Sequence, residues 1–256
     1  MNTFDFSFTE YESWLLTHID NMACPDDTCR RAFDLKRIHS LKVAKEIVEI
    51  GRRMQLNRQT LFLSGIIGLL HDVGRFEQFK TYRTFNDYLS VDHGDLGART
   101  IEANGALKQL HAQEKKVVVK AIRWHNKMEL PDDTDAQALF YAQLLRDADK
   151  LDIYRVVAEN ILRPDRPEPL PPAEEDISEA LYADLMAGRR VCYKDIRGST
   201  EMRMMQLNWI TDINFKPTLD LIVDRKYLDL IAGSLPKTEK IKACVGKVMC
   251  GLKERL

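Results

Sequence analysis

Residues 61–77 read LFLSGIIGLLHDVGRFE, an uncharged apolar stretch followed at once by a His-Asp pair. A membrane-spanning helix needs about 20 apolar residues, and this stretch is half that length, so it predicts a buried helix of a globular protein. Gly65 and Gly68 within it predict close packing of a neighbouring element rather than a turn. Because His71 and Asp72 end this apolar helix, we expect both side chains to enter from the buried side.

Histidine is scarce, with six among 256 residues. Three histidines besides the one at 71 are spread along the same half of the chain: His39, His93 and His125. On its predicted helix, His39 lies one turn from Leu35 and one turn from Val43, which predicts that it faces the core. A carboxylate-rich helix, RDADKLD, follows at 146–152. Several buried ionisable groups are costly unless they are paired or bind a metal, so this series indicates side chains that pair with one another or hold a metal.

In this order the residues resemble the HD-domain superfamily of metal-dependent phosphohydrolases. The pattern is a helical histidine (His39), the adjacent pair His71-Asp72 and an aspartate on a later helix, and HDVGRFE is similar to the family's H-D-x-G-K/R form. The resemblance covers about residues 30–160. It implies an all-α fold built on an HD-like helical bundle, to which helices predicted from the apolar periodicity of residues 173–256 are added.

The resemblance also implies a set of metal ligands. The family's last aspartate corresponds to Asp149 in D-K-L-D, or else to Asp147, and we expect Asp149 to bind metal and Asp147 to face the substrate. Members with two metals have two extra histidines, which HGDLG and AIRWHNK match at 93–97 and 121–127. With one metal, these two histidines would bind substrate phosphate instead. The implied ligands, with Asp72 as the bridge, are His39, His71, Asp72, His93, His125 and Asp149.

Nitrogen and oxygen ligands without thiolates suit divalent ions, and we expect one or two of Mn, Fe, Mg, Co, Ni or Zn. Such an ion lowers the pKa of bound water toward about 7 and neutralises charge on phosphoryl oxygens. Arg75 follows the pair at the family's Lys/Arg position, where a guanidinium can bind phosphate through two hydrogen bonds. We expect catalytic roles for Asp72, Arg75, His93 and His125. We expect substrate binding by Arg75, Lys150 and Asp147, with Arg123 and Lys127 as further cationic candidates.

The implied function is hydrolysis of a phosphomonoester or phosphodiester of a nucleotide-like small molecule. Arg75 stands where the deoxynucleoside monophosphatase-like branch has a glutamate general acid, so that acid is missing unless Glu77 replaces it. No G-Y-P element follows His125, which argues against cyclic di-GMP as the substrate. Two alternatives stay open: a di-iron oxygenase that cleaves C–C or C–P bonds, and a non-catalytic, metal-stabilised binding module.

The charge balance is 38 Lys and Arg against 39 Asp and Glu, a formal net charge of -1. This argues against a nucleic-acid polymer or an anionic membrane as the main partner, whereas a small phosphate-containing substrate needs only a local cluster of cations. Five scattered cysteines without a C-x-x-C pair, and a first segment without a basic region, predict a cytoplasmic protein without a disulfide framework. The sequence does not determine the oligomeric state.

Apolar residues recur with a period near 3.6, and no run alternates with period 2, which predicts helices throughout. The expected helices cover 9–22, 28–54, 57–70, 93–104, 114–126, 136–162, 174–187, 200–213, 218–232 and 238–254. Between the third and fourth of these we expect a polar connection rich in aromatic residues at 76–88. The proline-rich segment 164–172 predicts a break or an exposed loop. We expect one domain over residues 1–256, with an HD-like core at about 30–160.

Overall fold

The computed structural model describes residues 8–132, 135–163 and 173–256, and none of these residues lies in a β-strand. The all-α prediction is confirmed. The proline-rich segment 164–172 lies outside the described residues. The chain divides into two compact units, Met1–Asp149 and Lys150–Leu256. The expectation of one domain over the whole chain stays a prediction.

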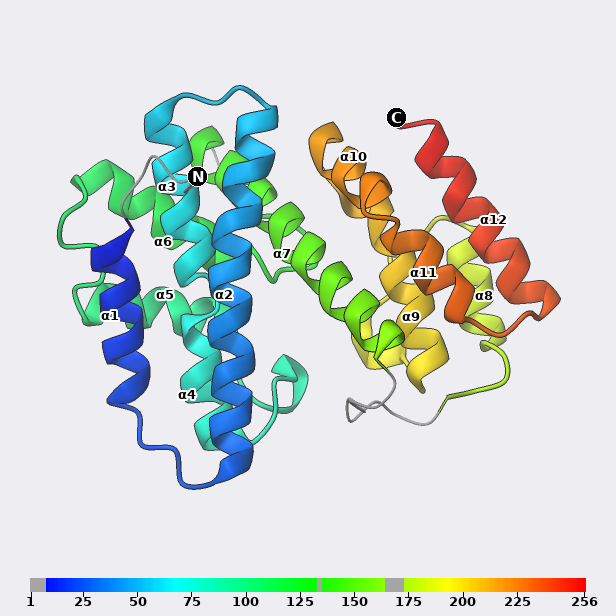
Figure 1. Ribbon diagram of the computed structural model, residues 1–256, viewed down its shortest axis with the longest axis horizontal. Helices are drawn as coiled ribbons and strands as arrows, with labels where there is room; N and C mark the ends of the chain where they lie inside the picture. The colour runs from blue at the N-terminus through cyan, green and yellow to red at the C-terminus, as the bar shows by residue number, and fades with distance from the viewer. Residues whose placement is uncertain (1–7, 133–134, 164–172) are drawn as a thin grey trace. The chain divides into compact units, whose positions relative to one another are not determined.

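The first unit is built around three pairs of packed helices. Its helices are α1 (Thr9–Asp20), α2 (Asp27–Arg53), α3 (Arg58–Leu70), α4 (Val73–Tyr82), the short 3-10 helix η1 (Asp87–Leu89), α5 (His93–Ala103), α6 (Ala112–Trp124) and the first part of α7 (Ala136–Leu162). Helix α2 packs along α3, and α5 packs against both α4 and α6 (Figure 1). The apolar residues at the centre of α3 are buried, as predicted from the uncharged stretch at 61–70.

Small residues let α2 and α3 approach closely. A Cβ atom on Gly68 would lie 2.9 Å from the Cα atom of Ala44 in α2, and one on Gly65 would meet the ring of Phe8. The predicted packing role of both glycines is therefore confirmed.

Helices α2 and α3 both begin at side-chain caps. The Asp26 side chain accepts a hydrogen bond from the backbone N–H of Cys29, and the Asn57 side chain accepts one from the backbone N–H of Thr60.

The predicted polar connection at 76–88 is wrong over its first half, because Val73–Tyr82 forms α4. Tertiary packing explains this helix: the Phe76 side chain is fully buried, and its ring meets that of Phe33 edge-on with centroids 5.2 Å apart. The helix ends at Arg83, whose φ of 58° lies in the left-handed region. The sequence pattern missed α4 because only two residues separate it from α3.

The second unit contains the end of α7 and seven further elements: α8 (Glu179–Met186), η2 (Tyr193–Asp195), α9 (Ser199–Asn208), η3 (Trp209–Asp212), α10 (Lys216–Asp224), α11 (Tyr227–Ser234) and α12 (Glu239–Lys253). Helix α12 packs against α8 and α9. The single helix predicted over 218–232 is wrong, since the chain breaks at Lys226, which has a φ of 56°. The helix predicted over 174–187 starts later, at Glu179, where Ser178 caps it.

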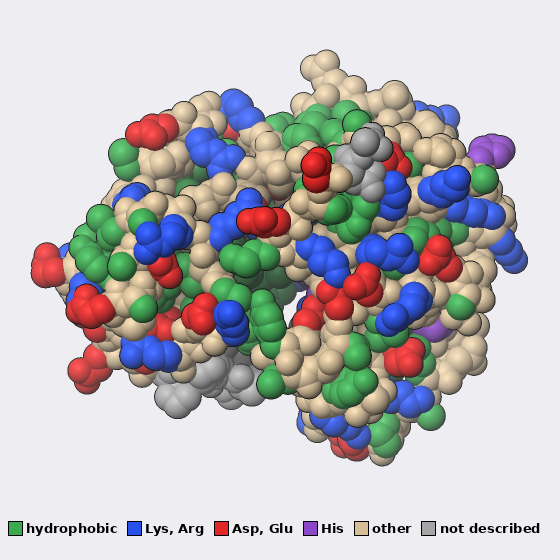
Figure 2. Space-filling view, turned by 180° about the vertical axis from the view of Figure 1, so that it is seen from behind, with side chains coloured by type: hydrophobic (Ala, Val, Ile, Leu, Met, Phe, Trp, Pro, Cys, Tyr) green, Lys and Arg blue, Asp and Glu red, His purple; other side chains and the backbone are tan. Residues whose placement is uncertain are grey.

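Two surface properties bear on the class of protein. Within the described residues, no helix has both the length and the apolar character that a membrane span requires. Basic and acidic side chains are interspersed on the face shown in Figure 2, in keeping with a formal net charge of -1. An excess of positive or negative charge would therefore be confined to small regions of the surface.

Candidate metal centre

The His-Asp pair lies at the junction of two helices. His71 is the C-cap of α3 and Asp72 is the N-cap of α4, and both are almost completely buried. Gly74, in the first turn of α4, lies against the start of α5: a Cβ there would be 2.4 Å from the carbonyl oxygen of His93. The first turn of α4 therefore lies in close contact with α5, which carries the next predicted ligand, His93.

Four other elements bring the remaining predicted ligands to the same place. His39 comes from α2, His93 is the first residue of α5, His125 is the C-cap of α6, and Asp149 lies on α7. Among the described residues, three groups each place one ligand atom per residue within 4.8 Å of one another. The groups are His39–His71–Asp72, His71–His125–Asp149 and Asp72–His93–His125. The structure thus brings all six predicted ligands together.

The Asp72 carboxylate occupies the middle of this cluster. Its Oδ2 atom lies 3.7 Å from His39 Nε2 and 3.5 Å from His71 Nε2. Its Oδ1 atom lies 3.5 Å from His93 Nε2 and 4.0 Å from His125 Nε2. One carboxylate oxygen therefore faces each pair of histidines, which is the arrangement a carboxylate bridging two ions requires.

Asp149 completes the side of the cluster formed by the first pair of histidines. Its Oδ1 atom lies 2.9 Å from His39 Nε2 and 3.8 Å from His71 Nε2. Burial raises the pKa of Asp149. The hydrogen bond and charge of His39, with the charge of His71, lower this pKa by more than burial raises it, so it lies well below its usual range. The carboxylate is therefore ionised, as a metal ligand must be.

Outer hydrogen bonds fix which ring nitrogen faces the centre in three of the clustered histidines. The Nδ1 atom of His71 lies 2.8 Å from the carbonyl oxygen of Gly68, and that of His125 lies 2.6 Å from the carbonyl oxygen of Ile122. The Nδ1 atom of His93 lies 2.6 Å from Asp87 Oδ2. Carbonyl and carboxylate oxygens accept hydrogen bonds, so in each ring Nδ1–H donates and Nε2 directs its lone pair toward the centre.

These lone pairs test whether the residues fit a metal ion. Burial, with smaller contributions from neighbouring cationic groups, lowers the pKa of His93 and of His125 to about 4, so both rings are neutral at pH 7. Their Nε2 atoms nevertheless lie 3.0 Å apart, where two lone pairs repel. The Nε2 atom of His71 is buried and has no hydrogen-bond partner among the described residues. A cation coordinated by these nitrogens relieves both problems, so the donor set fits a divalent metal.

Two cations flank the central carboxylate. Lys36 Nζ lies 2.8 Å from Asp72 Oδ2, and Arg75 Nε lies 3.6 Å from Asp72 Oδ1. Burial raises the pKa of Asp72, but Lys36, His71 and Arg75 together lower it well below its usual range. Both cations also lie over the ring of Phe85, with Lys36 Nζ 5.2 Å and the guanidinium carbon of Arg75 5.8 Å from its centroid.

Arg75 also supports the outer hydrogen bonds of the cluster. One of its terminal nitrogens, NH1, donates to Asp87 Oδ1 and to Gln78 Oε1, at 2.7 Å each. Asp87 is the carboxylate that accepts from His93, so Arg75 holds the group that orients this histidine. The Nε atom of Arg75 is buried and has no hydrogen-bond partner among the described residues.

Sequence reasoning missed Lys36 and Asp87. Lys36 precedes His39 by three residues on α2 and so shares its helix face, a spacing that could have identified it. Asp87 belongs to the short helix η1, and no spacing relates it to His93 in advance.

The other predicted site residues are placed as follows. Asp147 is fully buried and belongs to none of the three groups found among the described residues. Lys150 forms an ion pair with Asp212 at 2.8 Å inside the second unit. Their roles in substrate binding stay predictions. Glu77, the alternative general acid, is exposed on α4.

The two cations that flank His125 in the sequence are engaged with α5. Lys127 lies 3.0 Å from Asp95, and Arg123 lies 3.5 Å from the same carboxylate. Asn126 adds hydrogen bonds of 3.0 Å to Asp87 and to Asp92, the N-cap of α5. These contacts join the end of α6 to the start of α5 and so hold His93 and His125 side by side.

The comparison with known families agrees with this geometry. Residues 37–154 match the family model of the HD domain, a span that contains all six clustered residues. No curated protein and no solved structure matches the chain.

Proposed function

From the match of residues 37–154 to the HD domain family model, we propose that the protein is a metal-dependent phosphohydrolase. Its substrate would be a phosphomonoester or phosphodiester of a nucleotide-like small molecule. The observation that carries the proposal is the pair of cations, Lys36 and Arg75, held against the carboxylate that two of the ligand groups share. A site that only stored metal has no need of cations beside its ligands, whereas a site for anionic esters does.

The ligand groups suggest how metal ions would be held. One ion would be bound by His39, His71 and Asp72, with Asp149 beside His39 and His71 as a further ligand. A second ion would be bound by Asp72, His93 and His125. When bound, divalent ions supply Lewis acidity that lowers the pKa of water and positive charge that neutralises phosphoryl oxygens. With a single ion, the histidines of the other group would instead donate to the phosphate.

Lys36 and Arg75 would bind and orient the phosphate. Each lies beside a different oxygen of Asp72, so an anion that entered between them would lie next to the shared carboxylate. The Nε–H of Arg75, which has no hydrogen-bond partner among the described residues, would donate to a phosphoryl oxygen. The Phe85 ring beneath both cations offers an apolar surface to the organic part of the ester.

Metal content and activity under nitrogen test the proposal together. We expect one or two divalent ions per chain in protein purified without added metal. We also expect phosphate release from a panel of nucleotide monoesters and diesters, with Mn²⁺ or Mg²⁺ and without oxygen. Iron with activity that requires oxygen would favour the oxygenase, and metal without turnover across the panel would favour the binding module.

A further inference from the structure

A groove lined by α5, α6 and the segment between them has a charge pattern that the metal centre does not use. Its volume is about 470 Å³, within the range of about 300–1,000 Å³ usual for small-molecule sites. Five cations and one carboxylate line it: Lys108, Lys115, Lys116, Lys120, Arg123 and Glu102. On a chain with a formal net charge of -1, this is a local excess of positive charge.

The floor of the groove is apolar. Ile101 of α5, Leu107 of the following segment and Val119 of α6 line it, and each is at least nine-tenths buried. On α6, Lys116, Lys120 and Arg123 share the helix face that Val119 occupies, because they follow the i, i+4, i+7 spacing. The groove therefore offers an aliphatic surface bordered by a row of cations.

Some of these cations are already paired and others are not. Lys120 lies 3.2 Å from Asp135, and Arg123 lies 3.4 Å from Glu102. The side chains of Lys115 and Lys116 form no ion pair or hydrogen bond with any of the described residues. Two neighbouring lysines thus keep their charge available to an incoming anion.

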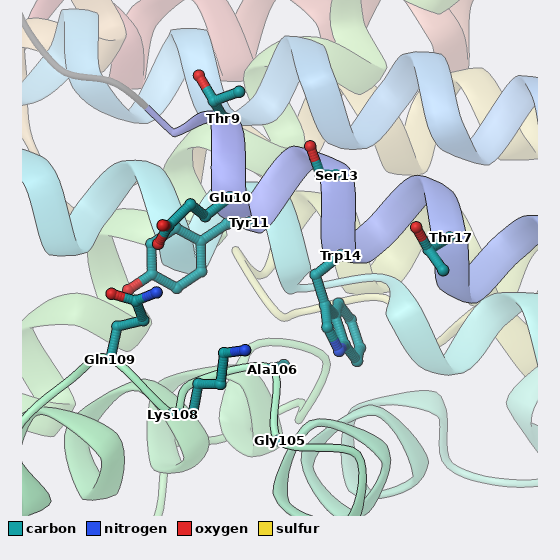
Figure 3. Close-up of a pocket in the computed structure, with 10 residues that line it drawn as sticks. All are labelled: Thr9, Glu10, Tyr11, Ser13, Trp14, Thr17, Gly105, Ala106, Lys108 and Gln109. Atoms are coloured by element: carbon teal, nitrogen blue, oxygen red, sulfur yellow. The ribbon is translucent and has the colours of Figure 1, made fainter.

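An adjacent hollow shows by contrast what is distinctive about this groove. It is lined by residues of α1 and of the segment at 105–109 and has a volume of about 410 Å³. Its lining includes one lysine and one glutamate, so it has no excess charge. Lys108 lines both hollows, and Figure 3 shows it extending toward the helix that carries Tyr11 and Trp14. The cations of α6 therefore distinguish this groove from its neighbour.

We propose that this groove binds an organic polyanion, a small molecule that joins an apolar ring system to a chain of phosphate or carboxylate groups. The apolar floor takes the ring, and the row of cations on α6 takes the anionic chain. Neither part suffices alone, because inorganic polyphosphate leaves the floor exposed to water and a neutral nucleoside leaves the lysines unpaired. The inference does not depend on the phosphohydrolase activity proposed above.

The test uses adenosine triphosphate as the probe, titrated calorimetrically into the full-length chain in the presence of EDTA. Circular dichroism checks that the chain stays folded. We expect saturable binding of one molecule per chain, and weaker binding of both tripolyphosphate and adenosine. Lys115→Ala/Lys116→Ala should weaken binding of the triphosphate by about tenfold or more, since two charge-assisted contacts are lost. The matched control Lys42→Ala/Lys80→Ala, which removes two exposed lysines elsewhere in the same unit, should leave affinity unchanged.

A second variant separates this groove from the metal centre. Asp72→Asn should leave binding of the triphosphate intact, even if the phosphohydrolase proposal fails. Binding lost in Asp72→Asn but kept in Lys115→Ala/Lys116→Ala would place the ligand at the metal centre and overturn the inference. So would an absence of binding, or tighter binding of a single-stranded RNA oligomer or an anionic lipid vesicle than of the triphosphate.

Discussion

Asp72 is the residue on which the metal centre depends most, because its two oxygens face two different pairs of histidines. Asp72→Asn removes the negative charge and replaces one oxygen with an amide nitrogen that cannot bind a cation. We expect metal content and phosphate release to fall together, by more than about tenfold, as measured by elemental analysis and a phosphate assay. Asp34→Asn, which alters an exposed carboxylate on α2, should change neither. Full metal content in Asp72→Asn would show that the ligand assignment is wrong.

Lys36 gives a cleaner test of phosphate binding than Arg75 does. Arg75→Ala would also release Asp87 and so disturb His93. Among the described residues of the cluster, Lys36 instead contacts the Asp72 carboxylate through its ammonium group. In Lys36→Ala we expect the KM for a phosphate ester to rise about tenfold, which is about 1.4 kcal/mol, with metal content unchanged. Lys36→Arg should recover part of the affinity. Steady-state kinetics with an unaltered KM would contradict the role given to this lysine.

The sequence predicted the six clustered residues but not the groups that orient them. These histidines and aspartates were identified through the resemblance to a family pattern, in which each ligand lies in a helix or at its end. Asp87 is different. It orients His93 because η1 lies beside the start of α5, and this position depends on how the two elements pack. The identities of such outer partners are decided in three dimensions.

The close contact of α4 with α5 gives a prediction at the scale of elements. In Gly74→Ala the new Cβ would lie 2.4 Å from the His93 carbonyl oxygen and 2.6 Å from the backbone nitrogen of Gly97. Both neighbours are backbone atoms, so α5 must shift, and His93 with it. We expect urea unfolding to show a loss of about 1–3 kcal/mol in stability and elemental analysis to show less bound metal.

Gly246→Ala on α12 is the control, because nothing lies within 4 Å of its added Cβ. That substitution should raise the free energy of unfolding by up to about 1 kcal/mol, since alanine favours a helix interior. If Gly74→Ala behaved in the same way, the packing of α4 on α5 would not constrain the centre.

Helix periodicity predicted the long elements and failed at the short ones. The 27-residue helices α2 and α7 show a repeated apolar pattern over many turns, and their expected ranges were nearly correct. Helix α4 has 10 residues, and its one fully buried ring, Phe76, gives no periodic signal by itself. The break between α10 and α11 depends on a left-handed residue, Lys226, which is not a glycine and so gave no warning in the sequence.

At the scale of the whole molecule, composition argued against classes of partner, namely a nucleic-acid polymer or an anionic membrane, but located no binding site. A formal net charge of -1 is the sum of local regions of opposite sign, and it cannot report either Lys36 and Arg75 at the metal centre or the lysines of the α6 groove. The division into Met1–Asp149 and Lys150–Leu256 is likewise absent from the sequence pattern, because it falls inside a continuous helix.

Metal binding should connect this centre to the stability of the chain. An ion that binds the folded state alone adds about 2.7 kcal/mol at a free concentration of 100 times its Kd. For a chain of this size we therefore expect Mn²⁺ to raise the Tm by about 5–10 °C, measured by calorimetry with and without EDTA. Asp72→Asn should show no such shift, and an unshifted wild-type chain would contradict the metal assignment. If residues 1–256 form one cooperative domain, the whole transition moves with metal, whereas two independent domains would give two transitions of which only one moves.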